Sequence, residues 1–158
     1  MLKRIINLVS SLIVHGSPRK IFLIGSSHFS LIRPNYSKIK DINDTLEDLK
    51  ISNMELHYLV DLGKVSRNTF PEKDKTEENF IHGCTSFAWI KLENSDPIQI
   101  KTVSDSMIVG GILALLEQTF NGESKSSIDN YDAQDLIDGL GLDGHISSQR
   151  LRGFDTAV

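Results

Sequence analysis

Apolar residues recur at helical spacing in the first part of the chain that the pattern marks as folded. They predict a helix over residues 41–51, with Asn43 as its cap. A second stripe of the same period predicts a helix that follows Asn53 as a cap and ends near Gly63. Residues 64–78 are polar and contain a proline, which is typical of a surface loop.

Beyond residue 78 the period changes from helical spacing to alternation. Residues 79–82 are a candidate short strand, and residues 86–93 and 98–103 are two better ones. In the second run Ala88, Ile90 and Leu92 share one face, and Phe87 and Trp89 share the other. Residues 94–97 read Asn-Ser-Asp-Pro, which is typical of a turn, so the last two runs predict an antiparallel hairpin.

The longest apolar stripe predicts a helix over about residues 105–120. Ser104 or Ser106 can cap this helix, and Gly122 can end it. Two glycines at 110–111 lower its helix propensity, so we expect another backbone to approach closely there.

Two shorter helical segments follow, over residues 132–140 and for a turn or two after Ser147. A helix pair, a small antiparallel sheet of about three strands and then more helices is the order of the α+β class. A chain of 158 residues is long enough for one such domain with a buried core.

Charge divides the chain in two. Residues 1–40 contain seven basic and no acidic residues, whereas residues 41–158 contain 10 basic and 21 acidic residues. An acidic domain repels phosphates, which argues against nucleic-acid binding.

The basic start predicts an organellar targeting segment, plastid-type or mitochondrial, and the alternative is a flexible tail or a misassigned start on a cytoplasmic protein. The apolar stretch 5–14 is too short to span a bilayer, so no membrane association is expected.

Cys84 is the chain's single cysteine and follows Gly83 between two predicted strands. It cannot form an intramolecular disulfide, and the scattered histidines have no ligand spacing, so we expect no metal site. A thiol reacts as its thiolate, which a nearby cation favours, and His82 and Arg150 are candidates for that cation. Two plainer alternatives stay open: Cys84 can be a buried small apolar residue, and His82 a solvated loop imidazole.

Three segments of the chain resemble the motifs of SufE-type sulfur acceptor proteins. Residues 79–90 resemble the family's N-x-V-x-G-C-x-S-x-V-W signature, and residues 104–111 resemble its S-D-A/S-x-I-V-x-G stretch. Residues 148–154 resemble its S-x-R-x-x-G-L element. The motifs occur in the family's order with matching gaps, and the resemblance covers residues 42–158.

The resemblance implies an α+β fold shared in outline with the IscU-type scaffold proteins. It implies that Cys84 accepts sulfur from a cysteine desulfurase of the SufS or CsdA type, which uses pyridoxal phosphate, and relays it to a SufBCD scaffold for iron–sulfur cluster assembly. The protein itself would bind no cofactor. It would be a monomer or weak homodimer, and an accessory sulfurtransferase and activator of the desulfurase more than a stand-alone enzyme.

The resemblance also assigns roles to individual residues. Arg150 would support the cysteine loop or its thiolate, with a surface salt bridge as the alternative. The positions expected to serve partner binding are Gly83, Ser86, Ser104, Asp105 and Gly153. The family's usual last helix would lie beyond Val158. Two other functions stay open, an adaptor that regulates the desulfurase without carrying sulfur and a redox-sensing thiol domain.

Overall fold

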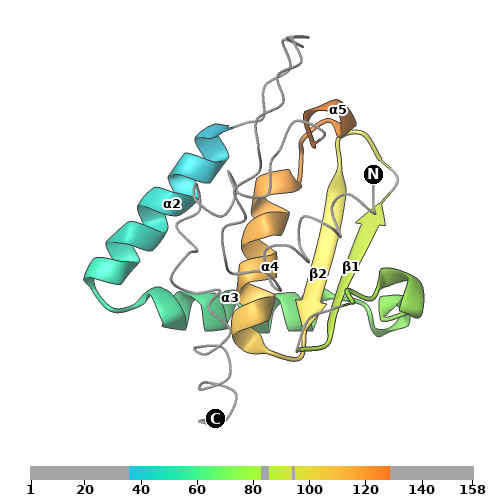
Figure 1. The fold of residues 1–158 in the computed structure, drawn as a ribbon, viewed down its shortest axis with the longest axis horizontal. Coiled ribbons are helices and arrows are strands. Elements are labelled where there is room, and N and C mark those ends of the chain that lie inside the picture. Colours follow the sequence, from blue (N-terminus) through green and yellow to red (C-terminus); the bar gives the residue numbers. More distant parts are fainter. Residues whose placement is uncertain (1–35, 83–85, 94, 129–158) are drawn as a thin grey trace, which may run out of the picture.

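A computed structural model describes residues 36–82, 86–93 and 95–128 of the chain, and Figure 1 shows their arrangement. The elements are the helices α2 (Tyr36–Ile51) and α3 (Glu55–Thr69), the 3-10 turns η1 (Glu72–Asp74) and η2 (Glu77–Asn79), the strands β1 (Ala88–Glu93) and β2 (Gln99–Ser104), and the helices α4 (Met107–Phe120) and α5 (Lys125–Ile128). Helices pack against a small antiparallel sheet, which confirms the α+β class.

Helix α2 begins earlier than its sequence pattern predicted. Residues 36–40 are helical, and Asn43 lies inside the helix, so the prediction that Asn43 caps it is wrong. Ile39 is 4% exposed and belongs to the hydrophobic core. The basic charge of residues 1–40 set them apart from the predicted folded domain, and Ile39 with them. The helix begins at Tyr36, inside that basic segment.

The prediction that Asn53 caps α3 is also wrong, because Asn53 ends α2. Its φ is 56°, in the left-handed region that asparagine tolerates better than most residues. The amide of Asn53 donates to the carbonyl of Lys50 (3.1 Å), and that of Met54 donates to Leu49 (2.8 Å). This pair of bonds is the Schellman arrangement, which satisfies the last carbonyls of a helix.

Helix α3 continues past Gly63 to Thr69, which corrects the predicted end and shortens the predicted loop. Gly63 marks a helix crossing instead, where a Cβ would lie 2.0 Å from the carbonyl oxygen of Met107 on α4. On the other helix, a Cβ at Gly111 would lie 2.1 Å from the carbonyl oxygen of Leu59. The close approach expected at residues 110–111 is therefore confirmed, and its partner is α3.

The hairpin is confirmed, with β1 and β2 paired from Ala88 opposite Ser104 to Glu93 opposite Gln99. Among the described residues the sheet has two strands and not about three. Residues 79–82 contribute only a bridge between Phe80 and Trp89. The amide of Phe80 is bonded to the carbonyl of Glu77 in η2 (3.3 Å), so the 3-10 turn uses a group that a longer ladder would need.

The face of β1 that carries Ala88, Ile90 and Leu92 is the one that faces the core. Ala88 and Ile90 are fully buried, and Leu92 packs partly against the same cluster. Helix α4 supplies most of the remaining core, and Figure 1 shows it between the sheet and α2. The largest fully buried side chains are Leu59, Ile81, Ile90, Ile98, Ile100, Leu113, Leu115, Leu116 and Phe120.

Side chains from α3, from α4 and from Asn121 just after α4 satisfy the outer edge of β2. The side chain of Asn121 accepts from the amide of Ile100 (2.6 Å) and donates to its carbonyl (3.1 Å). Glu117 accepts from the amide and the hydroxyl of Thr102, and Ser66 donates to the Thr102 carbonyl. Burial raises the pKa of Glu117, and the Thr102 hydrogen bonds oppose that shift. These groups replace a further strand at this edge.

The ends of α4 match the expected signals. Ser106 caps the helix by accepting from the amide of Val109 (3.4 Å), and Gly122 follows its end with φ 85°. Helix α5 at residues 125–128 was not predicted. The helices predicted over 132–140 and after Ser147 lie outside the described residues. Among the residues that the structure describes, no helix has the length and apolarity to cross a bilayer.

Candidate functional site

The site that the sequence singles out lies on the connection from η2 to β1. Phe80 bridges Trp89, and the amide of Ile81 donates to the carbonyl of Ala88 (2.9 Å). The chain that leads into residues 83–85 therefore lies beside the chain that follows them. Cys84 and Gly83 fall within 83–85 and so lie outside the described residues, as do Arg150 and Gly153.

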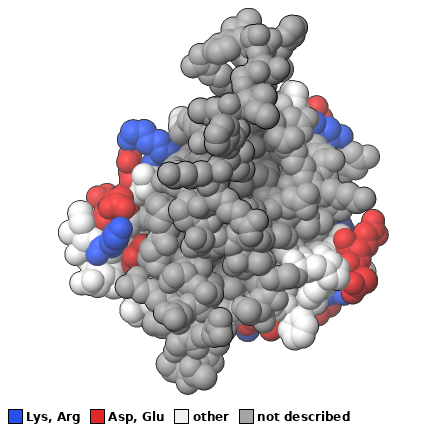
Figure 2. All heavy atoms as spheres, viewed as in Figure 1, with Lys and Arg blue, Asp and Glu red and all other residues white. Residues whose placement is uncertain are grey.

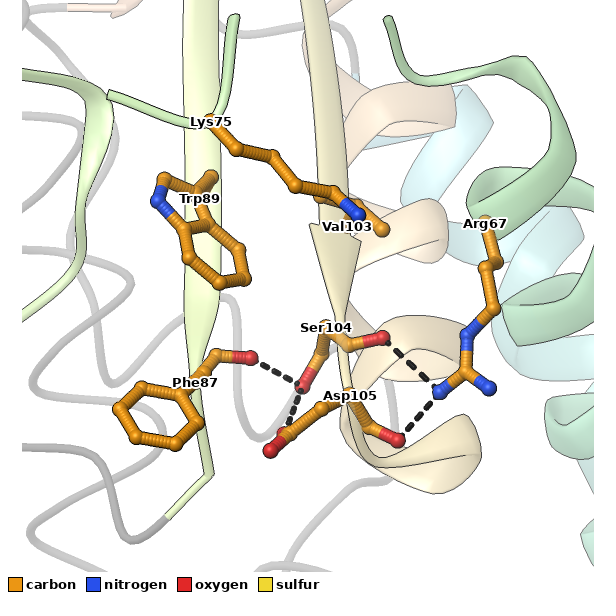
Figure 3. Close-up of a pocket in the computed structure, with 7 residues that line it drawn as sticks. All are labelled: Arg67, Lys75, Phe87, Trp89, Val103, Ser104 and Asp105. Atoms are coloured by element: carbon orange, nitrogen blue, oxygen red, sulfur yellow. Dashed lines mark hydrogen bonds between the residues drawn. The ribbon is translucent and has the colours of Figure 1, made fainter. Parts of the chain in front are cut away.

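The Ser-Asp-Ser sequence before α4 holds the chain just after that connection. The Ser104 hydroxyl donates to the carbonyl of Phe87 (2.9 Å), and the Asp105 amide donates to the same carbonyl (3.0 Å). The Ser106 amide in turn donates to the Ser104 hydroxyl (3.2 Å). We call this group, Phe87 with Ser104 and Asp105, the corner, and Figure 3 shows the bond from Ser104 to Phe87.

The four described residues that the sequence assigned to the site differ in exposure. Ser86 and Ser104 are buried, so their side chains face the interior of the domain. Asp105 and His82 are exposed. The structure thus brings Ser104 and Asp105 together with Phe87, the residue after Ser86.

His82 lies at the entrance to the connection and has a carboxylate beside it. Its Nε2 is 3.2 Å from Oε1 of Glu77, and both side chains are largely exposed. Its ring meets Phe80 edge to face, with the centroids 4.9 Å apart. The Asn79 side chain that opens the signature donates to the carbonyl of Asp74 (2.8 Å), which joins η2 to η1.

An aromatic group flanks the connection on the face of the sheet opposite the core. The Phe80 ring lies 5.5 Å from Trp89 and 6.0 Å from Phe87, and Phe87 and Trp89 stack at 6.3 Å. Phe87 is 61% exposed, although it is a large apolar side chain. An aromatic surface beside a candidate reactive position is well suited to contact another protein.

A shallow hollow of about 330 Å³ lies between this aromatic surface and α3. Its lining residues, drawn in Figure 3, are Arg67, Lys75, Phe87, Trp89, Val103, Ser104 and Asp105. Lys75 Nζ lies 5.7 Å from the Trp89 ring centroid and pairs with Glu72 (2.6 Å). Val103 is 1% exposed, so it contributes to the sheet packing more than to the surface.

Arg67 is a site residue that the sequence analysis missed. It lies in the last turn of α3, and its Nη2 donates to the carbonyls of Ser104 (3.3 Å) and Asp105. The available signal was a basic residue in the last turn of a helix. A positive charge there can bind the last carbonyls and interacts favourably with the helix dipole. The signal was hidden because α3 was expected to end near Gly63.

Acidic residues dominate the surface near the entrance of the connection. Glu72, Glu77 and Glu78 are exposed on η1 and η2. Figure 2 shows acidic side chains gathered at the lower right-hand edge of the molecule, and acidic and basic side chains together at the upper right and along the left-hand edge. Within the described part of the chain, no group of three His, Cys, Asp or Glu side chains could hold a metal ion.

The chain is similar to known proteins over most of its length. Residues 40–158 match the family model for the SufE Fe-S metabolism associated domain. The chain is 34% identical over 106 residues to an uncharacterized SufE-like protein of Rhizobium meliloti (strain 1021), which covers 64% of this chain and 75% of that protein. It is 30% identical over 122 residues to the cysteine desulfuration protein SufE of Wigglesworthia glossinidia brevipalpis, which covers 75% of this chain and 84% of that protein.

The fold and the matched domain define a protein of iron–sulfur metabolism. More particularly, the chain belongs to the SufE family, and the resemblance seen in its motifs is confirmed.

Proposed function

We propose that the protein is a sulfur acceptor and carrier. Cys84 takes sulfur from a cysteine desulfurase of the SufS or CsdA type, which uses pyridoxal phosphate, stimulates that enzyme and relays the sulfur to a SufBCD-type scaffold. Family membership and a relative named as a cysteine desulfuration protein support this role. The chain offers one thiol for it, Cys84.

The transfer needs only sulfur chemistry on this chain. The Cys84 thiolate attacks the outer sulfur of the desulfurase's cysteine persulfide, and a new S–S bond forms at Cys84. The S–S bond of the donor breaks, and the donor cysteine leaves as a thiolate. Atoms and electrons balance without an oxidant or a reductant, so this chain requires no cofactor of its own.

The observation that carries the proposal is the anchoring of the chain on both sides of residues 83–85. Backbone contacts of Phe80 and Ile81 hold the entrance, and Ser104 and Asp105 hold the carbonyl of Phe87 at the exit. A displacement at sulfur requires an aligned attack, and a nucleophile carried between two fixed ends meets that need better than one on a free tail.

The proposal also covers the cations near Cys84, the surface that contacts the desulfurase and the compartment in which the protein works. Arg150 and His82 are the cations that would favour its thiolate. The exposed aromatic surface around Phe87 would contact the desulfurase, with the protein acting as a monomer or a weak homodimer. If the basic segment that precedes α2 serves as a presequence, the reaction takes place in a plastid or a mitochondrion, and otherwise in the cytoplasm.

Substitution of the cysteine tests the proposal against its alternatives. Desulfurase activity is measured with the wild-type protein, with Cys84→Ser and with Ile51→Ser, a control at an exposed apolar position that is 82% accessible. We expect wild type and Ile51→Ser to stimulate the enzyme and Cys84→Ser to lose all stimulation. Stimulation that survives in Cys84→Ser would contradict the carrier and favour an adaptor. No stimulation by wild type, with oxidation of Cys84 instead, would favour a redox sensor.

A further inference from the structure

We propose that Arg67 is a positioning residue for sulfur transfer by Cys84. It acts through the corner, with no contact to sulfur required. The inference rests on the proposed function, because it concerns the orientation of the segment that carries the cysteine.

Arg67 joins two elements that are distant in sequence. Its Nη2 donates to the carbonyl of Ser104 (3.3 Å) and to the carbonyl of Asp105, so one guanidinium nitrogen binds two successive carbonyls where β2 passes into α4. Figure 3 shows the guanidinium on the α3 side of the corner. Arg67 therefore fixes the corner relative to α3, whose own position is set by the tight crossing with α4.

The corner passes this constraint to the cysteine-bearing connection. The Ser104 hydroxyl and the Asp105 amide both bind the carbonyl of Phe87, at 2.9 and 3.0 Å. Phe87 follows Cys84 by three residues. A shift of the corner therefore shifts the exit of the connection directly.

The entrance of the connection is held in a different way. Phe80 and Ile81 bind Trp89 and Ala88 through the backbone, and Phe80 meets the corner through its ring, whose centroid lies 6.0 Å from that of Phe87. Loss of Arg67 should therefore loosen one end and leave the other in place. The fold should survive such a change, because the hydrophobic core lies on the other face of the sheet.

The neighbouring cation cannot replace Arg67. Lys75 lines the same hollow, but its ammonium pairs with Glu72 (2.6 Å) and lies over Trp89. An ammonium is also a compact donor, whereas the planar guanidinium presents several donors in a fixed geometry. Arg67→Lys should therefore restore only part of what Arg67→Ala loses.

The test measures sulfur transfer from a persulfidated desulfurase to the full-length protein, over a range of acceptor concentrations. We expect Arg67→Ala to lower the maximal transfer rate by about tenfold, as small displacements of a reacting group do, and to leave KM for the acceptor unchanged. The matched control is Lys64→Ala, which removes a positive charge from the same helix at an exposed residue paired with Asp61. It should transfer sulfur like wild type.

A second measurement separates positioning from simple loss of activity. Alkylation of Cys84 by iodoacetamide in the free protein should become severalfold faster in Arg67→Ala, because the exit of the connection is less restrained, while transfer becomes slower. Thermal unfolding of each variant shows whether the fold is intact. A change in KM alone, or equal rates of transfer and alkylation in Arg67→Ala and Lys64→Ala, would overturn the proposal.

Combining Arg67→Ala with Ser104→Ala tests the route through the corner. If both act on the carbonyl of Phe87, the loss of transfer rate in the double variant, taken as a free energy, should be smaller than the sum of the two single losses. Additive losses would contradict the route. Failure of the proposed function is distinguishable, since wild type would then accept no sulfur, while the alkylation rates would still report whether Arg67 restrains Cys84.

Discussion

The α3–α4 crossing and the corner at Phe87 are held by different forces. At the crossing, Gly63 and Gly111 leave no room for a side chain, and the contact lies within a core of fully buried apolar residues. At the corner, a few hydrogen bonds from Ser104, Asp105 and Arg67 hold backbone carbonyls beside an exposed aromatic surface.

The difference shows how stability and function are separated in this small domain. The crossing fixes α3 and α4, and its energy comes from burial and close packing. The corner uses that fixed frame to orient the chain beyond residue 85, and its polar contacts contribute less to stability. Substitutions at the crossing should therefore change stability, and substitutions at the corner should change transfer.

The largest effect should come from Gly111→Ala. The added Cβ would lie 2.1 Å from the Leu59 carbonyl oxygen, so α3 and α4 must move apart at a cost of about 3 kcal/mol or more in unfolding free energy. Gly110→Ala is the matched control, because its added Cβ would have Gly63 Cα as its nearest neighbour, at 3.3 Å. Urea denaturation compares the two variants. Equal stability of Gly111→Ala and wild type would contradict the tight crossing.

A smaller effect is expected at the start of α2. Lys38 Nζ donates to the carbonyl of Asn121 (2.7 Å) and pairs with Glu123 (3.2 Å), whose side chain is 10% exposed. Lys38→Met should cost about 1.5–3 kcal/mol of unfolding free energy, because charged hydrogen bonds are lost and a mostly buried carboxylate loses its cation.

Lys40→Met provides the control for that change. Lys40 is exposed and pairs only with Asp44 among the described residues, so its loss should leave the denaturation midpoint unchanged. Both variants should stimulate the desulfurase normally once folded. Equal midpoints for Lys38→Met and Lys40→Met would show that the contacts of Lys38 with Asn121 and Glu123 add nothing to stability.

The smallest effect concerns pH and Glu117. Because burial raises the pKa of Glu117 above its ordinary value, the folded state disfavours the charged form. The resulting cost is absent below the unfolded-state pKa and appears as pH rises through the folded-state pKa. Glu117→Gln removes this cost, so its stability relative to wild type should increase from pH 4 to pH 7. A difference that does not vary with pH would contradict the assignment.

Residue patterns predicted the fold where periodicity and turn chemistry agree. The hairpin, the division of β1 into two faces, the Ser106 cap and the glycine contact on α4 all follow from local sequence. The extent of α3 does not, because Gly63 is both a common helix end and a residue required by tertiary packing. Asn53 was misassigned for a related reason, since asparagine serves both ends of helices.

The candidate site was predictable as a set of motifs but not as an arrangement. The Ser-Asp pair at 104–105 was found, yet its bond to the carbonyl of Phe87 depends on how β2 meets β1. Arg67 was missed because its partners are backbone carbonyls 37 and 38 residues away. Every residue has such a carbonyl, so the sequence does not indicate which one a side chain binds.

The most direct test of sulfur acceptance by Cys84 is the intact mass of the full-length protein after incubation with desulfurase and cysteine in the absence of reductant. We predict a gain of one sulfur atom that peptide mapping locates on Cys84 and that is absent from Cys84→Ser. An unchanged mass for wild type while the desulfurase itself becomes persulfidated would contradict the account.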